Sequence, residues 1–382
     1  MPRVEQHPEL PYWLALRRAG LGSTNFALLL ARFGSIEAAW GASAELLASA
    51  GLEAQYLRAV AKAKQAYDGE RELALMAKHG AHALTWLDEA YPASLRDTPR
   101  RPRVLSVGGP PGPQSEQAVA VGGPRHVTPY GRQAAEHFCS VLAQSGVAIV
   151  SGLARGVDAI AHRVALENGA PTVAVLAGGI DQVYPRENAG LAERIVENGC
   201  LVSEYPVGIP ARRDYFPRRN RILSGLARAA LLVEAGEGSG ALHTANWAFE
   251  QGRDVFAIPG SIFSRQSYGT NQLIRENTAK LVATPEQLCQ ELNLIATGAP
   301  STVAMPMEAQ PALFERRPAG EPKPAPSTID HPLLRWLAQG PLHIDEIARN
   351  AGLPIAEVSG ALQILELEGR VRPAGPMTYA IA

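Results

Sequence analysis

Residues 212–221, with the sequence RRDYFPRRNR, combine dense positive charge with aromatic rings. They contain five arginines, two aromatic side chains, one asparagine and a single acid, Asp214. A guanidinium group presents its donors in a fixed fork that suits phosphate oxygens, and exposed rings offer faces on which unstacked bases can stack. The segment therefore predicts contact with single-stranded nucleic acid, with an affinity that falls with salt by a slope of about −0.7 per phosphate contact.

The chain as a whole does not attract nucleic acid through its net charge. Its 382 residues carry a formal net charge of −1 at pH 7. Binding to a polyanion must therefore come from a local patch of the surface.

Cysteine usage and hydropathy predict a cytoplasmic protein without a membrane segment. The three cysteines, Cys139, Cys200 and Cys289, lie far apart and form no C-x-x-C pair, so neither a disulfide framework nor a zinc site is expected. Cys200 begins an apolar run and is predicted to be a small core residue. No stretch approaches the roughly 18 consecutive apolar residues of a membrane helix, and the N-terminus lacks the apolar core of a signal peptide.

The sequence pattern divides the chain into four predicted regions. Residues 1–75 have apolar positions at helical spacing and predict a small helical domain. Residues 76–295 alternate strands and helices. Residues 296–328 are rich in proline and predict a semi-extended linker. Residues 329–382 predict a helix that Gly352 ends, a second helix over 355–367 and a two-stranded hairpin, which is the pattern of a winged helix.

The central region predicts an α/β fold with a doubly wound parallel sheet. Runs such as GVAIVSG and AALLVEAG are almost continuously apolar, as expected of strands that are buried on both faces. Strand ends are expected at Val121, Val150, Leu176, Val202, Val233 and Ile258. Gly or Ser follows nearly every strand, and in such a sheet these loops share the carboxyl edge, where ligands bind. Residues 98–114 are rich in Pro and Gly and predict a boundary or an irregular connection.

Two glycine-containing turns could contact phosphate. Residues 20–24 (GLGST) lie between two predicted helices and form either a helix-hairpin-helix turn, whose backbone N–H groups meet a phosphate, or an ordinary turn. Residues 122–125 (GGPR) follow the first strand of the parallel sheet, where Arg125 and the N–H groups of the next helix could hold one anion. They lack the spacing of G-x-G-x-x-G, so no dinucleotide cofactor is expected.

The stretch 151–162 (SGLARGVDAIAH) contains the residue types of a hydrolase triad. Ser151 lies outside a G-x-S-x-G elbow, and Asp158 and His162 stand four residues apart on one predicted helix. We interpret Asp158 and His162 as a local side-chain pair that braces the helix start.

The loop 234–240 (EAGEGSG) joins a buried strand to a helix. Ser239 is predicted to cap this helix, and the free amides around Gly240 could hold a phosphate. Glu234, at the strand end, either orients a ligand or acts as a base, or it pairs with an arginine of residues 212–221. We favour the pairing.

Several motifs, in this order along the chain, resemble the DNA processing protein A (DprA/Smf) family. The match covers about residues 85–290 and includes TPYG (128–131), SGLARGVDAIAH (151–162), LAGGIDQVYPREN (176–188), YFPRRNRILSGLA (215–227) and VEAGEGSGALHTANWA (233–248). The resemblance implies an extended Rossmann-like domain, with a helical SAM-like domain before it and a winged helix after it. It also implies binding of single-stranded DNA, loading of the recombinase RecA during natural transformation, homodimers through the Rossmann-like domain, and neither an enzymatic activity nor a cofactor.

The resemblance places DNA contacts on residues of these motifs. The family's arginine of the first turn corresponds to Arg125, its aromatic residue to Phe216, and the basic residue before it to Arg213 or Arg212. The predicted nucleic-acid site consists of Arg125, Gly152, Arg155, Arg212, Arg213, Phe216, Arg219, Asn220, Arg221, Ser239 and Gly240, with no catalytic and no metal-binding residue. Where the family has V-G-S-R, this chain has GGPR, and Pro124 has no backbone N–H to offer a phosphate.

Two functions of other classes compete with this interpretation. The glycine-rich loop and its acid are similar to those of nucleotide-processing phosphoribohydrolases, although Thr244 and Ala245 stand where those enzymes carry a glutamate. The winged helix could instead read duplex DNA as a transcription factor. Its second helix, however, carries Glu357 and Glu366 and no Lys or Arg, so it should repel phosphates.

Overall fold

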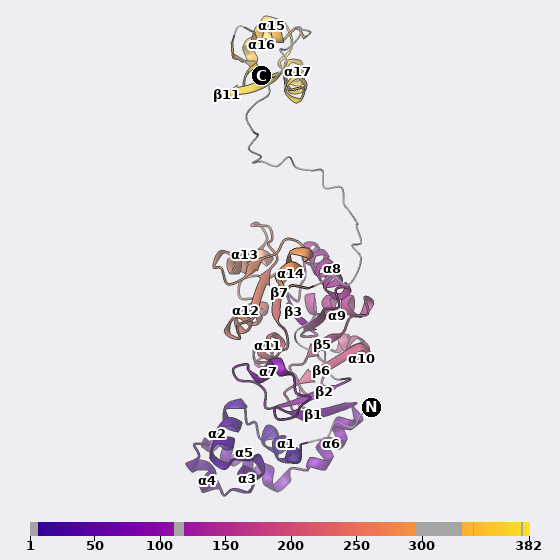
Figure 1. The fold of residues 1–382 in the computed structure, drawn as a ribbon, viewed down its shortest axis with the longest axis vertical. Helices are drawn as coiled ribbons and strands as arrows, with labels where there is room; N and C mark the ends of the chain where they lie inside the picture. Colours follow the sequence, from indigo (N-terminus) through magenta and orange to yellow (C-terminus); the bar gives the residue numbers. More distant parts are fainter. Residues whose placement is uncertain (1–6, 111–117, 295–330, 339, 376) are drawn as a thin grey trace. The chain divides into compact units, whose positions relative to one another are not determined.

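The computed structural model describes residues 7–110, 118–294, 331–338, 340–375 and 377–382 (Figure 1). The chain forms two compact units, whose described residues lie within 7–294 and 331–382. The linker predicted over 296–328 falls outside the described residues.

A nine-stranded sheet forms the centre of the larger unit, as far as its residues are described. The strands β6-β5-β4-β3-β7-β8-β9 lie side by side in this order and run parallel, and β2 and β1 continue the sheet antiparallel beyond β6. The bounds are β1 Ala81–Thr85, β2 Val104–Gly108, β3 Ala118–Gly122, β4 Ala148–Ser151, β5 Thr172–Val175, β6 Gly199–Ser203, β7 Ala229–Leu232, β8 Asp254–Ala257 and β9 Lys280–Leu281. The predicted doubly wound α/β fold is confirmed.

The winding direction of the sheet changes between β3 and β7. From β3 the chain moves outward through β4, β5 and β6, and it then returns to β7 on the other side of β3 before continuing to β8. The connections that follow β3 and β7 therefore leave in opposite directions. Such a switch point opens a crevice at the carboxyl ends of the two strands.

Helices cover both faces of the parallel strands. In β3, Val119 and Val121 pack in one core cluster with α8 (Pro129–Gln144), α9 (Val157–Glu167) and α14 (Pro285–Glu291), whereas Ala118 and Ala120 pack with α11 (Tyr215–Gly225), α12 (Gly240–Glu250) and α13 (Tyr268–Arg275). Burial on both sides explains why these strands are apolar at successive positions. Two more helices, α7 (Ala93–Arg96) and α10 (Ala189–Asn198), belong to the same unit.

The strands β1 and β2 correct the sequence interpretation. Residues 98–114 predict a boundary or an irregular connection, but β2 occupies 104–108 and pairs antiparallel with β1 and with β6. The prolines that suggested a loop, Pro99 and Pro102, come just before the strand, where their missing N–H groups disturb no ladder.

Six helices precede the sheet, as the helical spacing predicted. They are α1 Leu10–Arg18, α2 Ser23–Phe33, α3 Ile36–Gly41, α4 Ala44–Ser49, α5 Ala54–Ala66 and α6 Gly69–Lys78. Their apolar side chains share one core cluster with Val104 and Leu201 of the sheet. Arg17 of α1 forms a buried ion pair with Glu72 of α6 (3.2 Å) and also donates to Ser106 Oγ of β2 (2.9 Å), which ties the helices to the sheet.

The smaller unit has the winged-helix pattern that the sequence predicted. Its elements are α15 Leu334–Leu337, β10 Leu342–His343, α16 Ile344–Ala351, α17 Ile355–Leu367, β11 Val371–Gly375 and β12 Thr378–Ile381. Gly352 ends α16 in the left-handed conformation, with φ of 65°, which glycine adopts without a steric penalty. The short strand β10 pairs with β12 and completes a three-stranded sheet within the described residues.

No described helix is both long and apolar enough to pass through a lipid bilayer. Cys200, predicted as a core residue, is 1% exposed.

Replacing Glu72 by Ala should destabilise the larger unit by about 3–5 kcal/mol, because it leaves the buried guanidinium of Arg17 without its charged partner. Glu72 is 3% exposed and also binds Arg18 Nε at 2.8 Å. Chemical denaturation measures the loss. Glu70→Ala, an exposed change on the same helix, is the control and should cost less than about 1 kcal/mol. Equal losses in the two variants would contradict the structural role of the ion pair.

Candidate nucleic-acid interface

The basic segment forms the start of a helix. Although a proline disfavours helical conformation in the residue before it, α11 begins at Tyr215 and contains Pro217 as its third residue. A proline is tolerated there because the N–H groups of the first helical turn have no partner within the helix. Helical spacing then sends Phe216, Arg219 and Leu223 toward one side and Tyr215, Arg218 and Arg221 toward the other.

Arg219 fixes this helix to the carboxyl edge of the sheet. Its side chain is 4% exposed, and Nη1 donates to the carbonyl oxygen of Gly152 at 2.8 Å and to that of Val175. Burial lowers the pKa of the Arg219 guanidinium, and Asp158 opposes this effect. A Cβ atom on Gly152 would lie 2.2 Å from Arg219 Nη2, so only glycine leaves room for the guanidinium.

A cleft of about 390 Å³ opens beside α11, at the switch point between β3 and β7. Its walls come from the loop after β3, the start of α9, the start of α11 and the glycine-rich loop after β7. Six predicted site residues line it: Arg125, Phe216, Arg219, Asn220, Ser239 and Gly240. The loops that the sequence placed at the carboxyl edge therefore do meet.

Positive charge lies directly over an aromatic face in this cleft. The guanidinium carbon of Arg125 is 5.1 Å from the centroid of the Phe216 ring. Tyr184 meets the same ring edge to face at 5.8 Å and is 52% exposed. Tyr184 was not in the predicted site. It belongs to the LAGGIDQVYPREN motif, and its exposure beside another motif's aromatic residue is a tertiary feature that no local spacing encodes.

Helix N-termini add positive potential to the cleft. Ser239 caps α12 by accepting a hydrogen bond from the N–H of Ala241 at 3.4 Å, and Asn220 Nδ2 donates to the carbonyl oxygen of Gly240 at 3.3 Å. The first turns of α9, α11 and α12 all contribute lining residues. Each helix start carries partial positive charge on its unpaired N–H groups, which suits phosphate oxygens.

The remaining predicted arginines lie outside the cleft lining, and most of them are paired. Arg221 binds Glu204 at 2.5 Å, Arg155 binds Glu187 at 2.7 Å, and Arg212 binds Asp214 at 3.1 Å. Arg213 is exposed and makes no ion pair with any residue the structure describes. Gly152 is buried beneath the cleft, where it accepts the hydrogen bond from Arg219.

The predicted pairing of Glu234 with the basic segment is wrong. Glu234 is 1% exposed and accepts hydrogen bonds from Thr128 Oγ1 (2.6 Å) and from the Thr128 N–H (3.3 Å), at the N-terminus of α8. A Cβ atom on Gly131 would lie 2.0 Å from Glu234 Oε2, so a glycine is required there. The carboxylate stabilises the helix start through N–H donors and the helix dipole.

Asp158 and His162 also differ from the expected local pair. His162 Nδ1 lies 2.7 Å from Thr172 Oγ1, and burial lowers the pKa of His162 to about 3, so the ring is neutral. Asp158 accepts a hydrogen bond from the N–H of Ala154 at 3.3 Å, and burial raises its pKa. Asp158 thus does brace the start of α9, but through the backbone rather than through His162.

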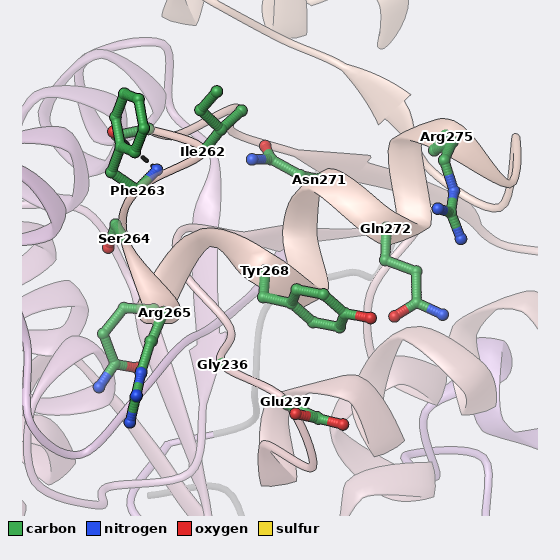
Figure 2. A pocket seen from close by; sticks show the side chains of 12 residues that line it. Gly236, Glu237, Ile262, Phe263, Ser264, Arg265, Tyr268, Asn271, Gln272 and Arg275 are labelled. Carbon is green, nitrogen blue, oxygen red and sulfur yellow. Dashed lines mark hydrogen bonds between the residues drawn. The ribbon is translucent and has the colours of Figure 1, made fainter.

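A second hollow adjoins the cleft on the other side of the glycine-rich loop (Figure 2). Gly236, Glu237 and Gln266 line both. Figure 2 shows Tyr268 and Arg265 on the loop and helix opposite Glu237, with Ile262 and Phe263 at one end. Within the described part of the chain, no group of three or more His, Cys, Asp or Glu side chains is placed to hold a metal ion.

Comparison with known proteins agrees with this architecture. Residues 82–293 match the family model of DNA recombination-mediator protein A, and residues 317–375 match a DprA winged helix domain. Protein Smf of Escherichia coli strain K12 is 36% identical over 301 residues, which cover 78% of this chain and 77% of that protein.

Solved structures of related proteins resemble this chain. That of DNA processing protein A from Streptococcus pneumoniae has a TM-score of 0.65 and 32% identity, and the match covers 74% of this chain and 97% of that one. The Helicobacter pylori protein, whose structure concerns its single-stranded DNA binding mode, has a TM-score of 0.50 and 27% identity, with 56% and 95% covered. The chain belongs to the DNA recombination-mediator protein A (DprA/Smf) family, as the order of its motifs indicated.

Proposed function

We propose that the cleft at the switch point binds single-stranded DNA, and that the protein serves DNA processing in natural transformation from the cytoplasm. The observation that carries the proposal is the Arg125 guanidinium 5.1 Å from the Phe216 ring, inside a cleft lined by helix N-termini. A flexible strand can place a phosphate near Arg125 and a base against the Phe216 ring. The single-stranded DNA binding of the Helicobacter pylori relative supports the proposal.

Replacing Phe216 by Ala should weaken binding of an oligothymidylate by about 1–3 kcal/mol, because one base loses its stacking partner. Fluorescence anisotropy at fixed salt measures the change. Phe249→Ala is the matched control, since this ring is 64% exposed at the opposite end of α12 and does not line the cleft. If both variants bind with the same affinity, the proposal that a base stacks on Phe216 is rejected.

A companion variant, Arg213→Ala, tests the phosphate contribution. Arg213 is exposed at the N-terminal end of α11. Its loss should weaken binding to every sequence alike and flatten the salt slope by about 0.7, because one phosphate contact disappears. Arg194→Ala, an exposed arginine on α10, removes the same charge away from the cleft. If the salt slope of DNA binding is unchanged in Arg213→Ala, Arg213 does not contact a phosphate.

We infer that the protein binds nucleic acid without turning over nucleotides. The acid at the end of β7, Glu234, is buried and held by Thr128, so it has little freedom to act as a base. Incubation with nucleoside monophosphates should leave them intact. Release of free base at a rate that follows the protein concentration would establish the hydrolase alternative.

We also propose that the protein forms homodimers through the Rossmann-like domain and loads RecA onto the bound strand, in keeping with its family. Ile262 (85% exposed) and Phe263 (92% exposed) form an apolar surface that a second copy would cover (Figure 2). Light scattering should give twice the mass of one chain, and Phe263→Ser should shift it toward the monomer. RecA filaments should form faster on DNA that carries the protein. A monomer at all concentrations, or no acceleration, would reject the respective proposal.

The smaller unit does not fit a duplex-reading role. Its helix α17 exposes Glu357 and Glu366, and residues 354–368 contain no Lys or Arg. These carboxylates would repel the phosphates that flank a major groove. We therefore place the DNA contacts of this protein on the larger unit.

A further inference from the structure

A second cleft, separate from the hollow in Figure 2, lies on the opposite side of α11 from the cleft at the switch point. Its volume is about 430 Å³, and it is bounded by the turn at residues 20–24, the loop after β6 and the α11 side that carries Tyr215, Arg218 and Arg221. The basic helix thus stands between two clefts. The first takes in Phe216 and Arg219, and the second takes in Arg218 together with residues of the N-terminal helical region.

The second cleft has an excess of positive charge. Five arginines line it, against one lining acid, Glu204. Glu204 is paired with Arg221. Glu72, which does not line the cleft, is paired with both Arg17 and Arg18. The five arginines and these two glutamates together carry a net charge of +3. The side chain of Arg218 is 69% exposed, and its nearest described acid, Asp214, lies 4.0 Å away. Because Asp214 is also paired with Arg212 at 3.1 Å, it neutralises Arg218 only weakly. Such a surface attracts an anion that presents several charges.

Aromatic faces and an unpaired hydroxyl accompany these charges. Tyr205 and Tyr215 stack with their ring centroids 4.1 Å apart, and Arg100 lies 5.9 Å from the ring of Trp247. The hydroxyl of Tyr205 is buried and has no hydrogen-bond partner among the described residues. Leaving such a buried group unsatisfied costs about 1–3 kcal/mol.

The turn at residues 20–24 closes the cleft on its far side. Helix α2 starts at Ser23 with Gly22 as its N-cap, and no side chain caps the N–H groups of its first turn. Ser23 Oγ instead donates to the carbonyl oxygens of Arg101 (2.5 Å) and Arg100 (3.2 Å), which holds the loop of Arg100 at the mouth of the cleft. The uncapped N–H groups and Arg100 therefore face one space together with Arg218.

We propose that this second cleft holds the backbone of the same DNA strand after it leaves the first cleft and passes around the N-terminal end of α11. This inference rests on the proposed function of the first cleft. Arg213, exposed and unpaired among the described residues, lies at the end of the helix where the strand would turn. The N-terminal helices thereby become part of the proposed DNA-binding surface, and of the two interpretations of the turn at 20–24 this proposal requires the phosphate contact.

A strand is favoured over a free phosphate for a geometric reason. The arginines that carry the excess charge come from three separate segments, around residues 18, 100 and 218, and they surround a volume larger than one anion fills. A polyanion can satisfy all three at once, and the ring of Trp247 offers an additional surface for a base. Because both clefts flank one helix, a single strand can occupy them in sequence.

The test is a series of oligothymidylates of increasing length, measured by anisotropy across salt with the full chain. The double variant Arg100→Ala/Arg218→Ala should bind the shortest oligonucleotides as tightly as the unaltered protein. It should bind the long ones several-fold more weakly, with a salt slope flatter by up to about 1.4, since two phosphate contacts are lost at about 0.7 each. Both side chains are exposed, so the fold should persist, and circular dichroism verifies this. Arg163→Ala/Arg194→Ala, two exposed arginines on α9 and α10, is the matched control.

The outcomes separate this inference from the proposed function. If Phe216→Ala weakens binding at every length while the double variant matches its control at every length, the second cleft takes no DNA and the inference alone is overturned. If Phe216→Ala has no effect at any length, the proposed function fails and the strand path fails with it. A double variant that keeps full DNA affinity but no longer promotes RecA filaments would assign the second cleft to a protein partner and overturn the inference.

Discussion

The buried guanidinium of Arg219 is the constraint on which the proposed DNA-binding face depends. It donates to the carbonyl oxygen of Gly152, which follows β4, and to that of Val175, the last residue of β5. These two bonds hold α11 at the carboxyl edge of the sheet. With this one side chain fixed, helical spacing determines the rest: Phe216 must face the switch-point cleft, and Arg218 must face away from it. A charge taken out of water is tolerated only where it is well hydrogen-bonded, which is why Gly152 has to leave the space open.

Much of the fold could be predicted because its signals are local. Strands buried on both faces are apolar at successive positions, and Gly or Ser at their ends indicates the turns of a doubly wound sheet. The cleft follows from the same facts, since the loops after β3 and β7 must meet where the winding reverses. The strand β2 escaped prediction because its partners, β1 and β6, are antiparallel neighbours that no pattern within residues 98–114 identifies.

The roles of individual site residues were less predictable, because they depend on tertiary partners. Arg219 and Arg218 are adjacent and identical in type, yet one is 4% exposed and the other has a side chain that is 69% exposed. Glu234 was assigned to the wrong partner because the sequence shows a nearby surplus of arginine but not the N-terminus of α8, whose Thr128 satisfies the carboxylate. Burial decides such choices, and burial is a property of the assembled fold.

Ion pairs hold three arginines of the predicted site, and this bears on how a nearly neutral chain would select a single strand. With Arg155, Arg212 and Arg221 engaged by acids, long-range attraction is weak, and the positive potential around the switch-point cleft comes from Arg125, Arg213 and helix N-termini. At physiological salt such fields extend only about 8 Å, so a phosphate must approach closely to benefit. Duplex DNA, stiff over about 150 base pairs, cannot bend its backbone into a cleft of this size, whereas a flexible strand can enter and expose its bases to Phe216. Under the proposed function, selectivity for single strands would thus follow from where the charge is placed rather than from how much of it there is.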